Sequence, residues 1–376
     1  MRRILNIAAA ALLVLVAPLA AVPSWDFPPP RPFTGSAWRN PYEGWQGGFK
    51  KVNLHAHSRA WGGLTSGASS AAELAEVYAA QGFDALAISN YFQLTKLEQP
   101  PLSLVRGWEH GLNLTKAHRL VLGTDEIVPI DFPISTRATR QWVLNMLGGT
   151  GALVGLNHPS LRGGHDCEEV EALTGFQLFE VHNAYATSHF EWDCALTAGR
   201  LAWAMGNDDS HSAAAGIGIA WNMVGAETAA EGPILSALGS GRSYVVRGEG
   251  GRMDVEVQRL SIEGDGVVLV LSAPASSIEW ITDGGQRRQL DRDTASSRFV
   301  PGPEHHYVRA VVRTPITELV LNPLVREGAW SAPRATIAWP RTIGSWALWL
   351  AAAVFVAWLT RPRRTLSLVP RERRAA

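Results

Sequence analysis

The chain has 376 residues, of which 34 are basic and 34 are acidic, so its formal net charge is zero at pH 7. Six of the basic residues are arginines between Arg361 and Arg374, which leaves the rest of the chain mildly acidic. Proteins that bind nucleic acids usually present a basic stripe. The charge therefore argues against nucleic acid as a partner, and the length is enough for a catalytic domain of about 200 residues and a second domain of about 90.

The N-terminal end of the chain has the composition of a membrane-directed segment. Arg2 and Arg3 are followed by an apolar stretch that ends at Val22, which is typical of a secretory signal peptide or a membrane anchor over 1–22. The sequence leaves open whether this segment is cleaved. Residues 23–48 are rich in proline, tryptophan and glycine, a composition that indicates an extended, partly packed linker.

The first motif that could carry chemistry is His55-Ala56-His57, which follows the apolar start of a predicted strand. Residues two apart in an extended strand point to the same side, so these two histidines can present their imidazoles to one cation. A His-x-His pair alone is weak evidence for a metal site, because many histidines at strand ends only form hydrogen bonds.

Five later apolar runs also end in polar clusters, and four of these clusters contain side chains that commonly bind metals. The run from Ala85 to Ile88 ends in Ser89-Asn90-Tyr91, which offers no strong ligand. The four ligand-rich endings are Gly123-Thr124-Asp125-Glu126, Asn157-His158-Pro159, His182-Asn183 and Gly206-Asn207-Asp208-Asp209-Ser210-His211.

Predicted helices lie between these runs. The clearest begins with a capping box, Ser70-Ala71-Ala72-Glu73, and continues with Leu74, Val77 and Tyr78 at helical spacing. Strands that alternate with helices predict an α/β fold of parallel strands with crossover helices. In a closed barrel of this kind the site forms at the C-terminal ends of the strands, where all the candidate ligands fall.

The order of the motifs resembles that of the polymerase and histidinol phosphatase (PHP) superfamily of metal-dependent phosphoesterases. The shared order is His-x-His, a strand that ends near Asp or Glu, His-Pro, a strand with a Glu-x-x-Asn motif that here starts at Glu180, and Asp-x-His. The resemblance covers about 49–325. It implies a distorted (βα)7 barrel over 49–250 and a small antiparallel β domain over 251–338.

The resemblance also implies a ligand set for two divalent metal ions. His55 and His57 would bind one ion together with Asp209. A carboxylate from the Gly123 loop would bridge to a second ion held by His158. Family spacing favours Asp125 as that carboxylate, and Glu126 is the alternative if the loop has gained a residue.

Three further residues are candidates for the site. His211 matches the last histidine of the family pattern and, with Asp209, is assigned to the catalytic centre. Asp208 could steer a proton, although an aspartate in such a loop is more often a turn residue. His182 lies near the site and is a further candidate ligand, although the family more often has an aromatic residue there.

Departures from the family pattern limit the number of metal ions. Trp61-Gly62-Gly63 stands where the family usually has Asp or His, and Asn90-Tyr91 stands where it has Asp-His. No histidine lies between Glu126 and His158 to match an additional ligand of many members. We therefore expect two ions at most, and the mixed imidazole and carboxylate ligands suit Zn, Mn or Fe.

The ligands predict a hydrolase that uses a metal-activated water, with a small-molecule phosphate ester as substrate. Two alternative functions are consistent with the same sequence. The first is a degenerate barrel that serves as a non-catalytic binding or sensing module. The second is a metal-dependent hydrolase of non-phosphate esters or amides.

The C-terminal third of the chain is predicted to contain strands and then one membrane helix. Two alternating runs around Glu263-Gly264-Asp265-Gly266 predict a hairpin, and further strand-like runs follow at 277–282, 307–312 and 318–321. Residues 343–360 contain no charge and span roughly 27 Å as a helix, enough to cross a bilayer.

The arginines that follow the helix predict its orientation. Positive residues stay on the cytoplasmic side of a membrane, so the tail over 361–376 should be cytoplasmic and the barrel extracytoplasmic, periplasmic or extracellular. The two cysteines, Cys167 and Cys194, could pair in such an oxidising compartment. Their sequence separation alone does not decide whether they do.

Overall fold

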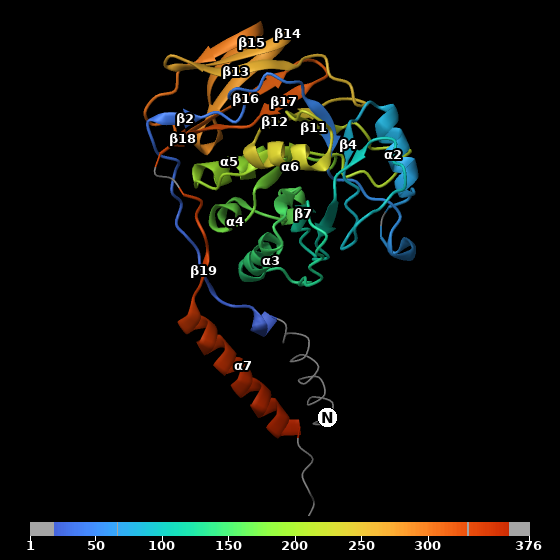
Figure 1. The fold of residues 1–376 in the computed structure, drawn as a ribbon. Helices are drawn as coiled ribbons and strands as arrows, with labels where there is room; N and C mark the ends of the chain where they lie inside the picture. The colour runs from blue at the N-terminus through green and yellow to red at the C-terminus, as the bar shows by residue number, and fades with distance from the viewer. Residues whose placement is uncertain (1–18, 66, 329–330, 361–376) are drawn as a thin grey trace, which may run out of the picture. The chain divides into compact units, whose positions relative to one another are not determined.

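The computed structural model describes residues 19–65, 67–328 and 331–360 (Figure 1). Most of the predicted N-terminal segment over 1–22 and the whole basic tail over 361–376 lie outside the described residues. The chain divides into two compact units, one formed by Asp26–Thr336 and the other by the two ends of the chain. The short strands β1 (Trp25–Asp26) and β19 (Thr336–Ile337) fall at the divisions between the units.

The larger unit contains a twelve-stranded sheet that extends from the first predicted strand to the C-terminal strands. Its main path runs in the order β13-β14-β16-β17-β12-β11-β3-β4-β5, with β15 paired to β14, and β18 paired to both β16 and β2. The strands are β2 (Ala37–Arg39), β3 (Lys50–Asn53), β4 (Ala85–Leu86), β5 (Ser103–Leu104), β11 (Ala220–Val224), β12 (Ser243–Arg247), β13 (Val257–Glu263), β14 (Gly266–Thr282), β15 (Gln286–Phe299), β16 (Tyr307–Arg313), β17 (Glu318–Leu321) and β18 (Leu324–Glu327).

A second sheet has five strands in the order β10-β9-β8-β7-β6. Strands β8, β9 and β10 run parallel, whereas β7 is antiparallel to both of its neighbours. The strands are β6 (Gly107–His110), β7 (His118–Leu122), β8 (Leu153–Asn157), β9 (Leu178–His182) and β10 (Trp203–Gly206). Every residue of β6, β7 and β9 is buried, as expected for strands covered on both faces.

Helices connect many of these strands. The predicted capping box is present at the start of α2, where the Ser70 hydroxyl accepts from the Glu73 amide and the Glu73 carboxylate accepts from the Ser70 amide. Gly82, at φ 75°, follows the end of this helix. The α-helices are α2 (Ala71–Ala80), α3 (Arg137–Gly149), α4 (Cys167–Ala172), α5 (His189–Thr197) and α6 (Glu231–Ser240), and the 3-10 helices are η1 (Trp61–Gly63), η2 (Leu161–Gly163) and η3 (Asp283–Gly285).

The two cysteines form a disulfide bond that joins α4 to α5. Cys167 and Cys194 have their Cα atoms 5.5 Å apart and are 27 residues apart in the sequence. The pairing that the sequence left open is therefore present.

The mixed α/β fold agrees with the prediction from the sequence. The hydrogen bonds between the described strands do not, however, form the predicted (βα)7 barrel as a single closed ring of parallel strands. The strands divide between two sheets, and β7, β11 and β12 pair antiparallel with their neighbours. Two isolated parallel bridges, Ala56–Ser210 and Tyr91–Glu109, link segments of the two sheets near the candidate site. Buried side chains from both sheets, among them Leu54, Leu120 and Leu178, share one hydrophobic core.

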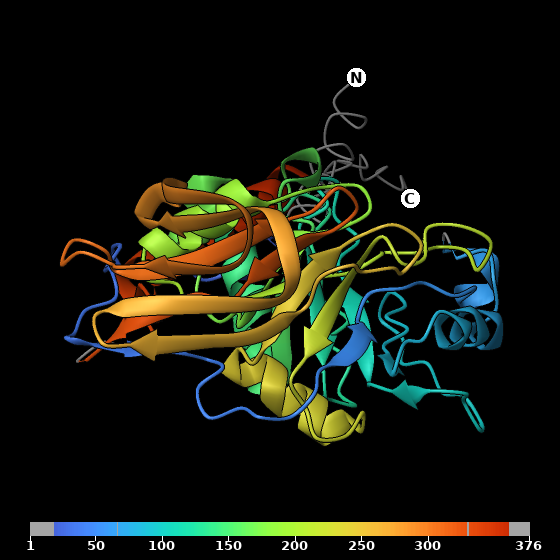
Figure 2. The ribbon, with the colours of Figure 1, turned by 90° about the horizontal axis from the view of Figure 1, so that it is seen from above.

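The C-terminal strands continue the larger sheet. The predicted hairpin is formed by β13 and β14 around Gly264, and the predicted strand at 318–321 coincides with β17. Figure 2 shows the long strands β14 and β15 running side by side, as their antiparallel pairing requires. Because β17 pairs with β12, these strands join the part of the sheet that carries the candidate site.

The other unit contains α7 (Trp339–Thr360), which begins a few residues before the predicted membrane segment. Its stretch Trp339–Leu359 is long and apolar enough to cross a membrane by length and composition. Among the described residues it is the one helix that meets this test.

Candidate metal centre

The His-x-His motif lies directly after β3 and presents both imidazoles to one point. The Nε2 atoms of His55 and His57 are 3.2 Å apart, and both side chains are almost fully buried. The backbone is held in place by hydrogen bonds from the His57 amide to the Ser210 carbonyl oxygen and from the His55 amide to Asn53 Oδ1. The local geometry is therefore the one that the two-residue period predicts.

Two carboxylates complete a first group of four donor residues. Asp209 Oδ1 is 3.2 Å from the Nε2 atom of each histidine. Glu109 approaches His55 Nε2 at 3.3 Å and His57 Nε2 at 3.1 Å. Ligands at about 2.0–2.1 Å in a tetrahedron around a cation lie roughly 3.3 Å apart, so these residues fit a divalent transition metal ion.

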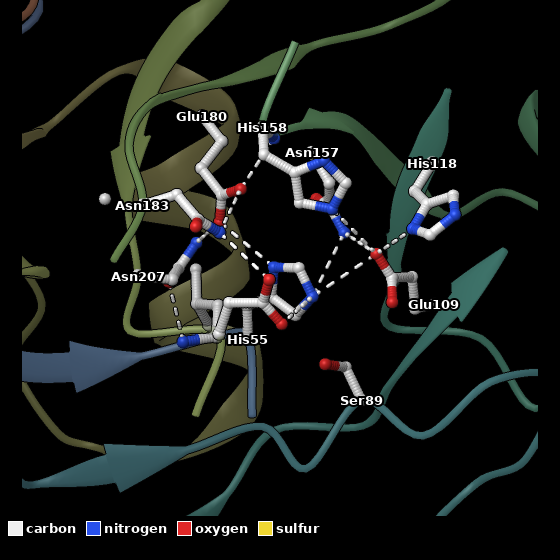
Figure 3. Close-up of polar contacts among 12 residues, drawn as sticks. His55, Ser89, Glu109, His118, Asn157, His158, Glu180, Asn183 and Asn207 are labelled. Carbon is white, nitrogen blue, oxygen red and sulfur yellow. Dashed lines mark hydrogen bonds and ion pairs between the residues drawn. The ribbon is translucent and has the colours of Figure 1, made fainter. Parts of the chain in front are cut away.

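A second group shares Glu109 with the first. His118 Nδ1 lies 3.0 Å from Glu109 Oε1, and His158 Nε2 lies 3.4 Å from the same oxygen. All three side chains are buried, and Figure 3 shows them pointing toward one another. One carboxylate thus lies between two sets of imidazoles.

The shared carboxylate is Glu109, and neither Asp125 nor Glu126 occupies that position. Asp125 is 72% exposed and pairs with Arg106 at 2.8 Å. Glu126 is also exposed. The physical reason is the direction of β7: because this strand is antiparallel to β8, its C-terminal end points away from the other ligand-bearing strand ends.

The same reversal explains why the sequence did not indicate His118. His118 is the first residue of β7. Because β7 runs antiparallel to β8, its beginning lies beside the end of β8, and His118 pairs with Asn157 there. Glu109 was missed because it lies inside the short run Gly107–His110, which ends in no obvious ligand cluster. The sequence places Glu109 between Trp108 and His110, and a charged residue is almost never fully buried, as Glu109 is, unless it is paired.

Glu180 orients several of these groups from behind. Its Oε1 atom accepts from His55 Nδ1 at 3.1 Å and from Asn207 Nδ2 at 2.9 Å. Its Oε2 atom accepts from the His158 amide at 2.7 Å and from Asn183 Nδ2 at 3.1 Å (Figure 3). With Nδ1 of His55 engaged in this way, the Nε2 lone pair is free to bind a metal.

Two of the candidate ligands have strained backbones. His158 and Asp209 adopt φ angles of 33° and 50°, which non-glycine residues seldom do. The His158 amide donates to Glu180, and the Asp209 amide donates to the His55 carbonyl oxygen at 2.9 Å. Such conformations cost about 1–3 kcal/mol each and cluster at functional sites. The surrounding hydrogen bonds hold them in place.

The electrostatics of the cluster favour ionised carboxylates. Burial alone would raise the pKa of Glu109, but His118 and His55 outweigh it and hold that pKa well below the usual range. Burial alone would lower the pKa of His55, yet Asp209, Glu109 and Glu180 hold it well above the ordinary value. The buried negative charge is balanced by imidazoles that a divalent cation can engage instead of protons.

The remaining predicted catalytic residues have different positions. The His211 ring centroid is 4.6 Å from that of His57, and its Nδ1 atom donates to the Asp209 carbonyl oxygen at 2.7 Å. Asp208 is fully buried, and its carboxylate accepts from the Tyr78 hydroxyl and from the amides of 218, 219 and 220. Asp208 therefore anchors the following loop, and its oxygens are occupied by these bonds.

His182 does not join the central cluster. Its Nε2 atom is 2.6 Å from Glu318 Oε1 and 3.2 Å from His189 Nε2. In a regular strand, side chains two residues apart point to the same side, so His182 would lie on the same side of β9 as Glu180 only if β9 were regular. The register of β9 with β10 shifts beside this residue, between Met205 and Gly206.

Tyr91 covers the side of the cluster where the family pattern had suggested a third pocket. Its ring stacks on His57 with centroids 4.9 Å apart. Burial, with Glu109 as the next contributor, raises the pKa of its hydroxyl, which therefore stays protonated. Asn90 instead bonds to Ser58, accepting from its amide and donating to its hydroxyl.

An apolar groove adjoins Tyr91. It has a volume of about 620 Å³. Trp61 forms part of one wall, where its indole N–H donates to the Tyr91 carbonyl oxygen at 2.7 Å, and it is 53% exposed. The lining residues are Trp61, Leu64, Thr65, Tyr91, Phe92, Leu112, Pro129, Asp131 and Pro133.

Comparison with solved structures adds a weak likeness. No protein-family model and no curated protein matches the sequence. A crystal structure of a two-domain protein containing a predicted PHP-like metal-dependent phosphoesterase, from Bacteroides vulgatus ATCC 8482, is similar with a TM-score of 0.42 and 13% sequence identity, over 79% of this chain and 91% of that chain. At this TM-score the likeness does not assign the chain to a family.

Proposed function

We propose that this protein is a metal-dependent hydrolase whose substrate is a small phosphate ester. The observation that carries the proposal is the position of Glu109, whose carboxylate lies 3.0–3.4 Å from donor nitrogens of His55, His57, His118 and His158. A carboxylate between two such sets suits a bridge between two divalent ions. The imidazole and carboxylate donors suit Zn, Mn or Fe.

The chemistry follows from the donors and from the residues that orient them. Divalent ions in such a centre supply Lewis acidity, which lowers the pKa of water and polarises a phosphoryl oxygen. Glu180 fixes the ring of His55, and Asn157 Nδ2 donates to Glu109 Oε1 at 2.9 Å, so the donors are held before substrate arrives. Neutral His211, with Nδ1–H engaged, keeps a lone pair on Nε2 that can take up a proton.

The groove beside Tyr91 supports a substrate with an apolar ester group. Its lining is mainly apolar, and Tyr91 both lines it and stacks on His57. A phosphate held at the centre would therefore have its apolar substituent next to Trp61, where burial of about 100 Å² of apolar surface would contribute roughly 2–3 kcal/mol to binding.

The motif order and the convergence of these residues together favour membership of the PHP superfamily, with 49–250 as the metal-binding domain and 251–338 as the β domain. We further propose that α7 anchors the protein in a lipid bilayer with this domain on the extracytoplasmic side. The disulfide between Cys167 and Cys194 supports an oxidising compartment.

The proposal is tested with the full-length protein purified in detergent. Metal content is measured together with hydrolysis of bis(p-nitrophenyl) phosphate, p-nitrophenyl phosphate and p-nitrophenyl acetate, before and after chelation. We expect metal-dependent hydrolysis of at least one phosphate ester. Bound metal without any hydrolysis would instead favour a binding module, and cleavage of the acetate alone would favour a non-phosphate esterase.

A further inference from the structure

A second set of metal-binding side chains lies outside the centre described above. His182 ends β9, His189 begins α5 and Glu318 begins β17, so three separate elements bring these side chains together. The distances are 3.2 Å between the two Nε2 atoms, 2.6 Å from His182 Nε2 to Glu318 Oε1, and 3.5 Å from His189 Nε2 to the same oxygen.

We propose that His182, His189 and Glu318 form an additional binding site for a divalent transition metal ion. Two of the three separations match the spacing of roughly 3.3 Å expected between ligands of one tetrahedral ion. The third, from His182 Nε2 to Glu318 Oε1, is a hydrogen-bond distance of 2.6 Å. It is about 0.7 Å shorter than that spacing, and a shift of the Glu318 side chain by this amount would open it. Imidazole donors favour ions such as Zn, Fe, Ni or Cu over Mg or Ca.

The hydrogen-bonding pattern supports a cation at this position. Both Nε2 atoms face each other and also face Glu318 Oε1. Two N–H groups pointing at each other repel, so in the metal-free form one imidazole must leave its Nε2 unprotonated. A metal cation can bind the lone pairs of both Nε2 atoms and of Glu318 Oε1 at the same time, whereas a single proton between these atoms cannot.

The surroundings orient the carboxylate for this role. Arg313 Nε donates to Glu318 Oε2 at 2.6 Å, which leaves Oε1 directed at the histidines. Arg313 also pairs with Glu279 at 2.9 Å, so its charge is shared between two carboxylates. Burial lowers the pKa of His182, and the positive charge of Arg247 lowers it further. We therefore expect this site to bind more weakly than the centre around Glu109.

The site is reachable and distinct. The side chains of His189 and Glu318 are 20% and 21% exposed, and three ligands leave at least one coordination position open. Among the described residues, none of the three side chains forms a hydrogen bond or ion pair with a member of the centre around Glu109. The inference therefore does not depend on the proposed phosphoesterase activity.

The test counts metal ions in full-length protein in detergent, stripped with a chelator, reloaded with Zn²⁺ and passed over a desalting column. His189→Ala and Glu318→Gln should each bind one ion fewer per chain than the wild type. The matched control is His306→Ala, which removes a half-exposed histidine that pairs with Asp283 elsewhere. Melting temperatures show whether each variant is folded.

The outcomes separate this inference from the proposed function. Loss of one ion in His189→Ala, with phosphate-ester hydrolysis within about twofold of the wild type, supports the additional site. An unchanged metal count in folded His189→Ala overturns it. Loss of one ion in a protein that hydrolyses no ester leaves the additional site standing and overturns the proposed function. Cobalt(II) loading gives an independent readout: the absorption bands of one tetrahedral ion should disappear in His189→Ala, and their persistence would also overturn it.

Discussion

His118 Nδ1 lies 3.0 Å from Glu109 Oε1 across the antiparallel pair β6 and β7. The start of one strand and the end of its neighbour therefore meet at the same place. This contact joins the two sets of imidazoles through one carboxylate, and it exists only because β7 runs against the direction of β8.

Replacement of Glu109 tests the shared carboxylate. Glu109→Gln keeps the size of the side chain but removes its charge, so we expect phosphate-ester hydrolysis to fall by at least about 100-fold and the metal content to drop, since loss even of an outer partner of a ligand costs roughly 10–100-fold. Steady-state kinetics and metal analysis measure the two effects. Asp125→Asn is the control and should remain within about twofold of the wild type. Equal activity of Glu109→Gln and wild type would contradict the role of Glu109.

The contrast between Glu109 and Asp125 shows which site residues could be predicted from the sequence and which could not. His55, His57, His158 and Asp209 follow strands that end at the cluster, so their motifs alone indicated that they would converge. Glu109 and His118 depend on the direction of β7, which is a non-local property of the sheet. A short apolar run has the same local pattern in either direction.

Local features of the fold could be predicted from the sequence, whereas the contacts of His182 and Asp208 could not. The capping box at Ser70 and the hairpin around Gly264 are local features, and the structure contains both as predicted. The position of His182 outside the central cluster could not be predicted, because its partner Glu318 lies 136 residues away on a C-terminal strand. Asp208 is next to Asp209 in the sequence, yet it bonds to backbone amides instead of joining the cluster.

Glu180 is predicted to act through the groups that it orients. The glutamine side chain of Glu180→Gln has one acceptor oxygen instead of two, so it cannot keep the hydrogen bonds from His55, Asn207 and the His158 backbone amide. Metal affinity should therefore fall by about 10–100-fold. Competition with a chelating dye measures the affinity. The control is Glu126→Gln at an exposed position, which should leave it unchanged. Equal affinities for Glu180→Gln and Glu126→Gln would be inconsistent with an orienting role.

The groove is predicted to select for apolar ester groups. Trp61→Ala should raise KM about tenfold for an aryl phosphodiester and leave KM for a methyl phosphodiester nearly unchanged, since loss of a pocket wall is worth about 1–3 kcal/mol. Initial-rate measurements on the two esters give the ratio. Ile262→Ala, on the exposed side of β13, serves as the control. A similar change in KM for both esters would mean that the groove does not hold the substituent.

The disulfide is predicted to stabilise the packing of α4 on α5. Replacing both Cys167 and Cys194 by serine removes a crosslink between positions 27 residues apart, which should lower the free energy of unfolding by about 2–4 kcal/mol. Urea unfolding followed by tryptophan fluorescence measures this difference. A reducing agent should shift the wild-type midpoint but not that of the double variant. Coincident midpoints for the two proteins would argue against the stabilising role.

Glu109 is proposed to lie between two metal ions. The most direct test is anomalous X-ray diffraction from crystals of the protein, with data collected at the absorption edges of zinc, manganese and iron. Two anomalous peaks, one beside His55 and His57 and one beside His118 and His158, with Glu109 between them, are the predicted result. Crystals of metal-loaded protein that show no anomalous peak beside Glu109 would contradict the proposed metal centre.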